Sequence, residues 1–523
     1  MIELTHRKEV SRVEGRVKLI FEGKEYSALT GSTVKAALTD AGISFAAPCG
    51  GRRICGKCRV FAKGALSPLC EEEERYLSDR DIERGGRLAC CAVIKGDVTV
   101  SRYSAEDGFA IETETPHLMS TDKDFGIGMA LDIGTTTVVA AFYDRKRGER
   151  LNVFSALNPQ RSCGADVVSR IECASSETGK LVLRNSILEL VNGFIADFFD
   201  SISASSSEKI DSAVVSGNTA MELLFAGYGI SSLGVSPFIP ESLLGEWYDG
   251  KGLGLDRVKK IYMMPCCGPF FGGDAVASML AAGFYGAEDP FFMADIGTNG
   301  EFAVTSDGKT FLATSAAAGP AFEGAEIRFG TGSIPGAICK VRSLDPISDI
   351  ETIDKKAPVG ICGSGITDVI AVGLEQGLIS ADGRITDTRA LFEGQPALWL
   401  FGDIYLTQSD VRKVQLAKGA IFAAAEILLE RMETLPNRSY LMGGFGTTID
   451  VLSAERIGLL PSTLCRNAQS GGNGSLMGAT KVLLSEESLR QAEYIVQNTQ
   501  VISVAETEDF QRRFTEAMLF DEK

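Results

Sequence analysis

The sequence has 523 residues and a formal net charge of −17 at pH 7, and 45% of its residues are hydrophobic. This length exceeds what one hydrophobic core supports and predicts two or three domains. The negative charge argues against nucleic acid and against an anionic membrane as partners, because both attract basic surfaces.

The numbers and positions of cysteine and histidine limit the kinds of metal site and catalytic group that the protein can have. No apolar run is long enough to span a bilayer, and the first residues, MIELTHRKEV, lack the apolar core of a signal peptide, so we expect a cytoplasmic protein. The 13 cysteines are then expected to be thiols and metal ligands rather than disulfides. Both histidines, His6 and His117, precede the large C-terminal region. Catalysis in that region must therefore use carboxylates, hydroxyls, backbone amides and bound metal.

The first part of the chain, residues 1–103, is predicted to form a compact α+β domain. The expected elements, in chain order, are a hairpin of two strands, a helix, a strand, a helix and a last strand: Val17–Phe21 and Tyr26–Leu29, a helix that begins at Ser32 or Thr33 and ends near Gly42, Arg59–Ala62, Glu71–Leu77 and Val93–Ser101. The acidic run Glu71–Glu74 suits the first turn of a helix, and we expect it to be solvated.

A cysteine motif lies within this domain. Cys49, Cys55 and Cys58 follow the spacing Cys-x5-Cys-x2-Cys, and Cys90 lies far beyond them in the sequence. Three ligands on one loop and one distant ligand are typical of a 2Fe–2S cluster. The spacing resembles that of adrenodoxin-type ferredoxins, and Arg87-Leu88-Ala89-Cys90 resembles the segment that carries their fourth ligand.

Alternatives exist for the fourth ligand and for the motif. Cys91 is the rival of Cys90, and Cys70 is a weaker candidate. A structural zinc site usually has two Cys-x2-Cys pairs, whereas one is present here with no histidine nearby. Residues 51–58 also approach the phosphate-binding P-loop pattern, but Cys58 replaces the hydroxyl that would hold magnesium. The motif therefore favours a 2Fe–2S cluster.

Residues 104–126 are polar and lack periodicity, which predicts a linker. From Ile127 onward, predicted strands alternate with helices in the α/β manner, and residues 127–523 are expected to form one large domain. The segment Leu131–Thr135 returns as Ala294–Thr298, and each copy lies between two apolar strands. This repeat predicts two related halves that face a cleft, at about 127–290 and 291–485, followed by a C-terminal segment that returns to the first half.

Each copy places a carboxylate at the end of a strand, before glycine and hydroxyl residues. Such a turn can wrap phosphates with backbone N–H groups while the carboxylate orients magnesium-bound water. We therefore expect Asp132 and Asp295 to act on a magnesium triphosphate from opposite sides. A later Gly-Gly pair leaves room for an adenosine, and Glu323 and Glu326 are weaker candidates for contact with ribose or magnesium. The expected nucleotide-binding residues are Gly134, Thr135, Thr136, Thr137, Gly297, Thr298, Asn299, Gly443, Gly444 and Gly446.

Taken in order, these motifs resemble the superfamily of sugar and acetate kinases, heat-shock chaperone ATPases and actin, over about residues 127–485. The resemblances imply a duplicated, ribonuclease H-like α/β fold for the ATPase domain and an α+β β-grasp fold for the ferredoxin-like domain. Further motifs look like those of the reductive activators of corrinoid enzymes: Asn158–Gln160, Gly164–Val167, Ser216–Met221, Ala318–Gly324 and Gly360–Gly365.

Membership of that family implies a function. The cluster would accept an electron from a low-potential donor and pass it to an inactive Co(II) corrinoid, on a corrinoid protein or a methyltransferase, which restores Co(I). By this resemblance, Asp132, Asp295 and Gly443–Gly446 handle ATP with Mg²⁺, and the four cysteines carry the electron. Some members have an additional domain before the ATPase, where this chain has only residues 104–126. The predicted helix Val411–Glu430 is expected to lie in the core or at a homodimer contact.

Three other functions are compatible with the same motifs. The first is a small-molecule kinase with a redox-regulated ferredoxin domain. The second is a redox sensor that binds nucleotide and a partner without turnover. The third is an activator of a different low-potential enzyme, such as a radical dehydratase.

Overall fold

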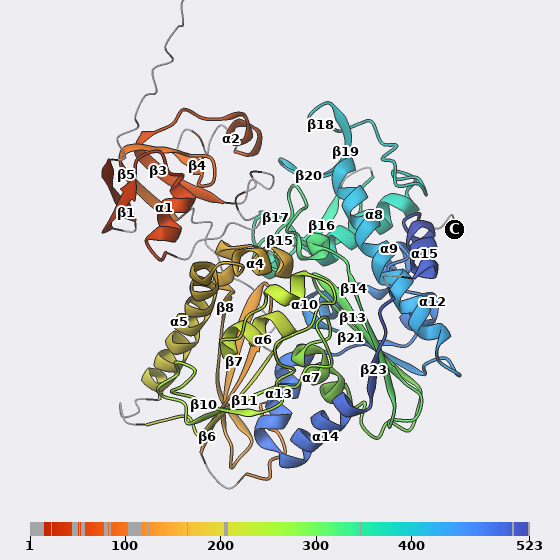
Figure 1. Cartoon of the computed structure of the whole chain (residues 1–523). Helices are drawn as coiled ribbons and strands as arrows, with labels where there is room; N and C mark the ends of the chain where they lie inside the picture. The colour runs from red at the N-terminus through yellow and green to blue at the C-terminus, as the bar shows by residue number, and fades with distance from the viewer. Residues whose placement is uncertain are drawn as a thin grey trace, which may run out of the picture. The chain divides into compact units, whose positions relative to one another are not determined.

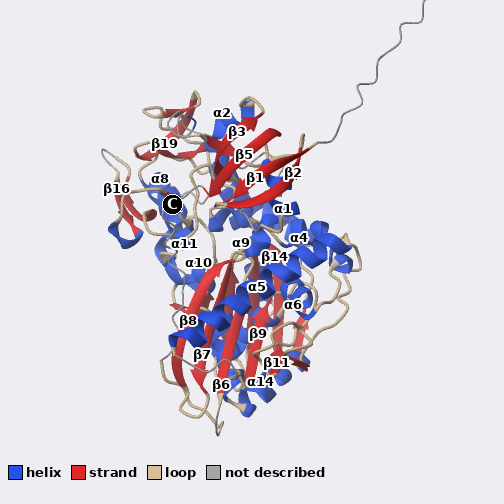
Figure 2. Ribbon diagram, turned by 90° about the vertical axis from the view of Figure 1, so that its left-hand side faces the viewer, coloured by secondary structure: helices blue, strands red, loops and turns tan. Residues whose placement is uncertain are grey.

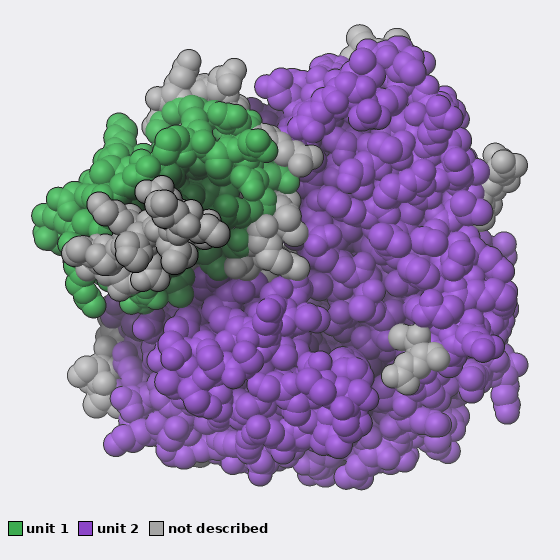
Figure 3. Space-filling view, turned by 45° about the horizontal axis from the view of Figure 1, so that its top comes forward, with its two compact units in different colours: residues 1–106 green, residues 107–523 purple. Residues whose placement is uncertain are grey.

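The chain folds as two compact units, residues 1–106 and 107–523, which Figure 3 colours separately. The structure is a computed structural model. It describes residues 15–21, 23–43, 51, 53, 58–77, 82, 85–102, 117–123, 126–164, 166–202, 208–345, 348–504 and 507–520. Each unit has a hydrophobic core of its own.

The first unit is built on a five-stranded sheet of order β2-β1-β5-β3-β4. Its elements are β1 (Arg16–Phe21), β2 (Lys24–Leu29), α1 (Val34–Asp40), β3 (Arg59–Leu66), α2 (Glu71–Tyr76), β4 (Gly86–Leu88) and β5 (Ile94–Arg102). The predicted hairpin is confirmed, since β1 and β2 pair in antiparallel register. Thr33 caps α1 by accepting a hydrogen bond from the Ala36 amide, also as predicted. The short strand β4 is an addition that the sequence pattern did not reveal.

One expectation for this unit is wrong. Glu71 and Glu74 are exposed, but Glu73 is fully buried although it belongs to the same acidic run. Its carboxylate receives two hydrogen bonds from the Arg87 guanidinium, both at 2.8 Å, and a third from the Leu88 amide at 3.0 Å. Charge pattern alone does not distinguish the one glutamate that faces the core.

The second unit contains two six-stranded sheets with the same plan. The first sheet has the order β10-β11-β9-β6-β7-β8 and the second β22-β21-β12-β13-β14-β23. The strands of the first are β6 (Ile127–Ile133), β7 (Thr137–Asp144), β8 (Glu149–Leu157), β9 (Ser212–Gly217), β10 (Trp247–Asp249) and β11 (Lys260–Met263). Those of the second are β12 (Phe291–Ile296), β13 (Asn299–Thr305), β14 (Phe311–Ala317), β21 (Arg438–Met442), β22 (Ala468–Ser470) and β23 (Thr499–Val501).

Three consecutive antiparallel strands, followed by two parallel ones beside the first, recur in both sheets. In the first half β9 and β11 lie parallel beyond β6, and in the second half β21 and β22 lie parallel beyond β12. The repeated aspartate segments therefore occupy the same place in two related sheets. The duplicated ribonuclease H-like plan expected from the sequence is confirmed.

Helices cover both sheets and join them. The α-helices are α4 (Val167–Cys173), α5 (Glu177–Ser201), α6 (Thr219–Ala226), α7 (Gly273–Ala282), α8 (Gly363–Glu375), α9 (Gln408–Glu430), α10 (Gly443–Thr448), α11 (Val451–Arg456), α12 (Ser462–Cys465), α13 (Gly474–Leu484), α14 (Glu486–Gln497) and α15 (Glu508–Ala517). The long helix α5 packs on the first sheet (Figure 2), and α9 packs on the second. Helices α7 and α13 lie between the sheets and share one core with both (Figure 1). Most of the apolar side chains of α9 are buried, so this helix is part of the core.

The second half also carries a smaller subdomain of two three-stranded sheets. One has the order β16-β15-β17 and the other β18-β19-β20. Their strands are β15 (Ala337–Ser343), β16 (Asp349–Thr352), β17 (Gly360–Ile361), β18 (Leu391–Phe392), β19 (Gln395–Phe401) and β20 (Ile404–Thr407). Toward the end of the chain, α13 contacts β6 and β9, whereas β23 pairs with β14 and α15 packs on α9. Among the described residues, none of the helices is both long and apolar enough to cross a membrane.

Candidate functional site

Two of the four predicted cluster ligands lie side by side in the first unit. Cys58 immediately precedes β3 and Cys90 follows β4, and the antiparallel pairing of Arg59 with Leu88 brings the two cysteines together. Their sulfur atoms are 3.1 Å apart, and both side chains are buried. Two buried thiols at this separation suit adjacent ligands of one metal centre. Cys49 and Cys55 lie outside the described residues.

The two alternative ligands face each other instead. The sulfur of Cys91 is 3.8 Å from that of Cys90, and it lies within 4.8 Å of ligand atoms of Cys70 and Glu72. Burial raises the pKa of the Cys91 thiol well above its usual range, and it also raises the pKa of Cys70. The local geometry therefore groups Cys91 with Cys70, and it groups Cys90 with Cys58.

The first predicted phosphate turn connects β6 to β7, and three polar side chains hold it. The Asn158 amide donates to the carbonyl oxygen of Gly134 at 2.7 Å, and the Asn218 amide donates to the Thr135 hydroxyl at 3.2 Å. Arg170, which is fully buried, donates to the carbonyl oxygen of Thr135. Asn158 and Asn218 come from motifs that were quoted for their resemblance alone, whereas Arg170 lies outside them and was not predicted. The hydrogen bonds of the two asparagines give those motifs a physical role, which is to fix the shape of the turn.

Asp132 stands at the end of β6, beside the N-terminus of α13. Its two carboxylate oxygens accept hydrogen bonds from the Ser475 hydroxyl at 2.7 Å and from the Asn473 amide at 2.9 Å. The side chain is 8% exposed, and burial raises its pKa. Residues of the C-terminal part of the chain thus orient the first aspartate. No sequence motif pointed to Asn473 and Ser475.

The second aspartate lies at the equivalent strand end of the other half. The Ser278 hydroxyl donates to Asp295 at 3.1 Å. Gly443 adopts a φ of +76°, and a Cβ atom built there would lie 2.5 Å from the Asp295 carboxylate. Any larger residue at this position would therefore collide with the aspartate. A Cβ at Gly444 would meet nothing within 4 Å, so the space beside Gly444 is open at the start of α10.

Four carboxylates gather around the two turns. Burial, and then the charges of Asp295 and Asp132, raise the pKa of Asp274 to about 7. Burial likewise raises the pKa of Asp295 to about 6, and it raises that of Glu301. A divalent cation would relieve the mutual repulsion of these ionised groups, and oxygen donors of this kind are those that Mg²⁺ prefers. Asp274 was missed because nothing in the sequence near it resembles the repeated turns.

A carboxylate also joins the two turns. Glu323 accepts a hydrogen bond from the Thr298 hydroxyl at 2.8 Å and another from the Thr136 hydroxyl. Thr136 belongs to the first half and Thr298 to the second. The predicted phosphate-binding hydroxyls of both halves are therefore brought to one point of the second unit.

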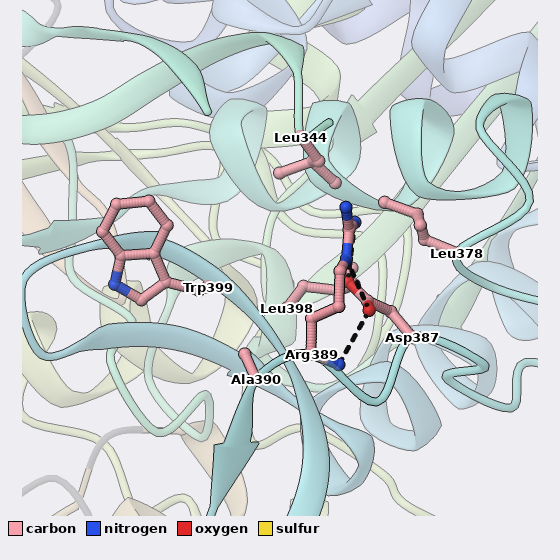
Figure 4. Close-up of a pocket in the computed structure, with 7 residues that line it drawn as sticks. All are labelled: Leu344, Leu378, Asp387, Arg389, Ala390, Leu398 and Trp399. Atoms are coloured by element: carbon pink, nitrogen blue, oxygen red, sulfur yellow. Dashed lines mark hydrogen bonds and ion pairs between the residues drawn. The ribbon is translucent and has the colours of Figure 1, made fainter. Parts of the chain in front are cut away.

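A separate pocket of about 230 Å³ lies in the smaller subdomain, apart from these residues (Figure 4). Its lining residues are Leu344, Leu378, Asp387, Arg389, Ala390, Leu398 and Trp399. The Arg389 guanidinium is paired with Asp387 at 2.9 Å, as the figure shows. None of the predicted site residues lines this pocket, so it gives no support to the nucleotide site.

Three family descriptions match most of the chain. They are the 2Fe-2S iron-sulfur cluster binding domain at residues 20–95, the RACo middle region at 127–287, and the C-terminal domain of RACo, its ASKHA domain, at 289–523. The chain is 36% identical over 403 residues to the corrinoid activation enzyme RamQ of Eubacterium limosum. That alignment covers 70% of this chain and 66% of RamQ, so the chain spans about two thirds of the length of this relative.

Two further comparisons agree with this result. The [Co(II) methylated amine-specific corrinoid protein] reductase of Methanosarcina barkeri is 26% identical over 399 residues, which cover 69% of this chain and 71% of the reductase. A solved structure of a reductive activator for a corrinoid, iron-sulfur protein has the same fold, with a TM-score of 0.69 and 24% identity, and the match covers 96% of this chain and 98% of that chain. The chain therefore belongs to the RACo family of reductive activators of corrinoid proteins, with an N-terminal 2Fe–2S ferredoxin-like domain and an actin-like ATPase domain.

Proposed function

We propose that this chain uses ATP hydrolysis to drive one electron from its 2Fe–2S cluster to the Co(II) corrinoid of a partner, which restores Co(I). The partner would be a corrinoid protein or a corrinoid-dependent methyltransferase, and a low-potential protein would supply the electron. The observation that supports this most is the joining, in one chain, of a buried Cys58–Cys90 pair and a duplicated fold with two aspartate turns. The names of the two relatives refer to corrinoid activation and to the reduction of a Co(II) corrinoid protein.

We assign the cluster to residues 1–103 and the ATPase to residues 127–523, with 104–126 as the linker. Cys49, Cys55, Cys58 and Cys90 would hold the cluster, which supplies the one-electron chemistry when it is bound. We prefer Cys90 to Cys91 because its sulfur lies against that of Cys58, whereas Cys91 lies against Cys70.

The nucleotide would bind between the two halves of the second unit. The segments Gly134–Thr137 and Gly297–Asn299 would hold the phosphates through backbone N–H groups and hydroxyls. Asp132 and Asp295 would hold Mg²⁺ and its water ligands, and the mutual repulsion of the four carboxylates supports a cation there. The loop that contains Gly443, Gly444 and Gly446 would receive the adenosine, because the space beside Gly444 is open and a side chain at Gly443 would collide with Asp295.

The need for ATP follows from redox energetics. Moving one electron uphill by 100 mV costs about 2.3 kcal/mol. A plant-type cluster has a potential near about −400 mV, and the Co(II)/Co(I) couple of a corrinoid is expected to lie below that value. Closure of the halves around the nucleotide could favour a complex in which cobalt accepts the electron more readily.

The test is the appearance of Co(I) in an anaerobic mixture of the chain, a Co(II) corrinoid protein and a low-potential reductant. We expect the Co(I) absorption bands to rise only when ATP and Mg²⁺ are both present. A non-hydrolysable ATP analogue separates nucleotide binding from hydrolysis in the same assay. Equal yields of Co(I) with and without ATP would contradict the coupling. A phosphorylated metabolite instead of free phosphate would indicate a kinase.

A further inference from the structure

Glu323 occupies the point where the two predicted phosphate turns meet. It ends a short 3-10 helix, Pro320–Glu323, that follows β14, and Gly324 continues the chain with a φ of +69°. A Cβ atom at Gly324 would lie 2.4 Å from the carbonyl oxygen of Thr331, so only glycine fits this turn. The backbone around Glu323 is thus fixed, and its side chain points to the two threonine hydroxyls.

Both hydroxyls are assigned to phosphate by the proposed site. They converge on the Glu323 carboxylate from opposite halves, so the terminal phosphate of a bound triphosphate would lie beside this side chain. A carboxylate and a phosphate repel each other unless a proton or a cation lies between them. When the hydroxyls turn to the phosphate, the freed oxygens of Glu323 need a new donor, and water is the donor at hand.

The other carboxylates of the cleft already have different partners. Asp132 is held by Asn473 and Ser475, and Asp295 is held by Ser278. Glu323, in contrast, is bonded to the two threonine hydroxyls that a bound nucleotide would contact. The positive charge of Arg170 also attracts the Glu323 side chain.

We propose that Glu323 positions the water that attacks the terminal phosphate of ATP and takes up one of its protons. The new bond joins the water oxygen to the γ-phosphorus, and the bond from phosphorus to the ADP oxygen breaks. One proton of the water stays with the phosphate product, and the other passes through Glu323 to solvent. This inference rests on the proposed function, because it requires that the cleft hydrolyses ATP.

The decisive variant is Glu323→Gln, which keeps the size and hydrogen-bonding ability of the side chain but cannot take up a proton. We expect steady-state ATP hydrolysis to fall about 10²- to 10⁴-fold, the usual contribution of a general base. Binding of a fluorescent ATP analogue should stay within about threefold, since uniform binding and turnover are separable. Glu323→Asp retains a base at the wrong distance and should give an intermediate rate.

The control is Glu433→Gln, in the same half of the second unit, because Glu433 is exposed and is not among the predicted site residues. It should leave hydrolysis within about twofold of the wild-type rate, as expected for a surface substitution. Far-ultraviolet circular dichroism and binding of the ATP analogue report whether the second unit of each variant has folded, and iron content reports the same for the first unit. If Glu323→Gln hydrolyses ATP as fast as the wild type, Glu323 merely ties the turns together and this inference is wrong. If the wild-type chain itself hydrolyses no ATP, the proposed function and this inference both fail.

Discussion

At the scale of single residues, the assignment of the fourth cluster ligand depends on two neighbouring cysteines. The sulfur of Cys90 is 3.1 Å from that of Cys58, whereas Cys91 shares its surroundings with Cys70 and Glu72. We therefore predict that Cys90→Ser lowers the iron and sulfide content or changes the electron paramagnetic resonance of the reduced cluster. Cys91→Ser should leave both unchanged. The measurement is iron analysis with spectroscopy on anaerobically purified protein.

Cys70→Ser is the control for general effects of removing a thiol near the cluster. Loss of iron in Cys91→Ser, together with an unchanged spectrum in Cys90→Ser, would reverse the assignment. The sulfurs of Cys90 and Cys91 are only 3.8 Å apart, so Cys91 can partly replace the missing ligand in Cys90→Ser. The spectrum is therefore measured as well as the iron content.

Residue types and spacing predicted the site residues that lie in short motifs. They missed the site residues that other segments of the chain contribute. Asp132 and Asp295 stand out because the same pattern occurs twice. Asp274 and Ser475 carry no such pattern, since their importance comes from the packing of α7 and α13 between the sheets. Glu323 was a weaker candidate in sequence because its partners, Thr136 and Thr298, lie in other parts of the chain.

At the scale of elements, the buried pair of Glu73 and Arg87 ties α2 to β4, the strand that leads to Cys90. Glu73→Ala would leave the Arg87 charge buried without its partner, and we expect a loss of about 3–5 kcal/mol in the free energy of unfolding. The measurement is the urea concentration at which the visible absorption of the cluster disappears. It should fall clearly below that of the wild type.

Glu74→Ala offers a matched comparison within the same helix, because Glu74 is exposed. It should change the free energy of unfolding by no more than about 0.5 kcal/mol. If both variants lose the cluster at the same urea concentration, the buried pair does not stabilise this unit.

The element pattern also shows where periodicity succeeds and where it fails. The strands β6, β7, β12 and β13 are apolar runs beside a repeated turn, and all were predicted. The strands β15–β20 form two small sheets in the subdomain, and they were not predicted. They are short, and β15 alternates exposed and buried residues irregularly and shifts register twice in its pairing with β16. Such strands are defined by their neighbours more than by their own sequence.

At the scale of the whole molecule, one chain contains two units with separate cores, 1–106 and 107–523. A cluster and an ATPase could in principle act independently, and joining them is useful only if electron transfer and hydrolysis serve the same event. The fold class and the family were accessible from sequence because both sets of motifs are local. The coupling between the units is a property of the working complex, so it requires an experiment on the intact chain.

Two single substitutions separate the activities. Cys58→Ser removes a predicted cluster ligand, and it should abolish Co(I) formation while basal ATP hydrolysis stays within about twofold, because Cys58 belongs to a unit with a separate core. Asp132→Asn should keep the iron content and visible spectrum, but hydrolysis should fall by about 10²-fold or more through loss of electrostatic stabilisation. An equal mixture of the two variants should form little Co(I), because no chain in it has both a cluster and an active cleft. Co(I) formation by the mixture at the wild-type rate would contradict this prediction, and it would mean that hydrolysis in one chain can drive the electron from another.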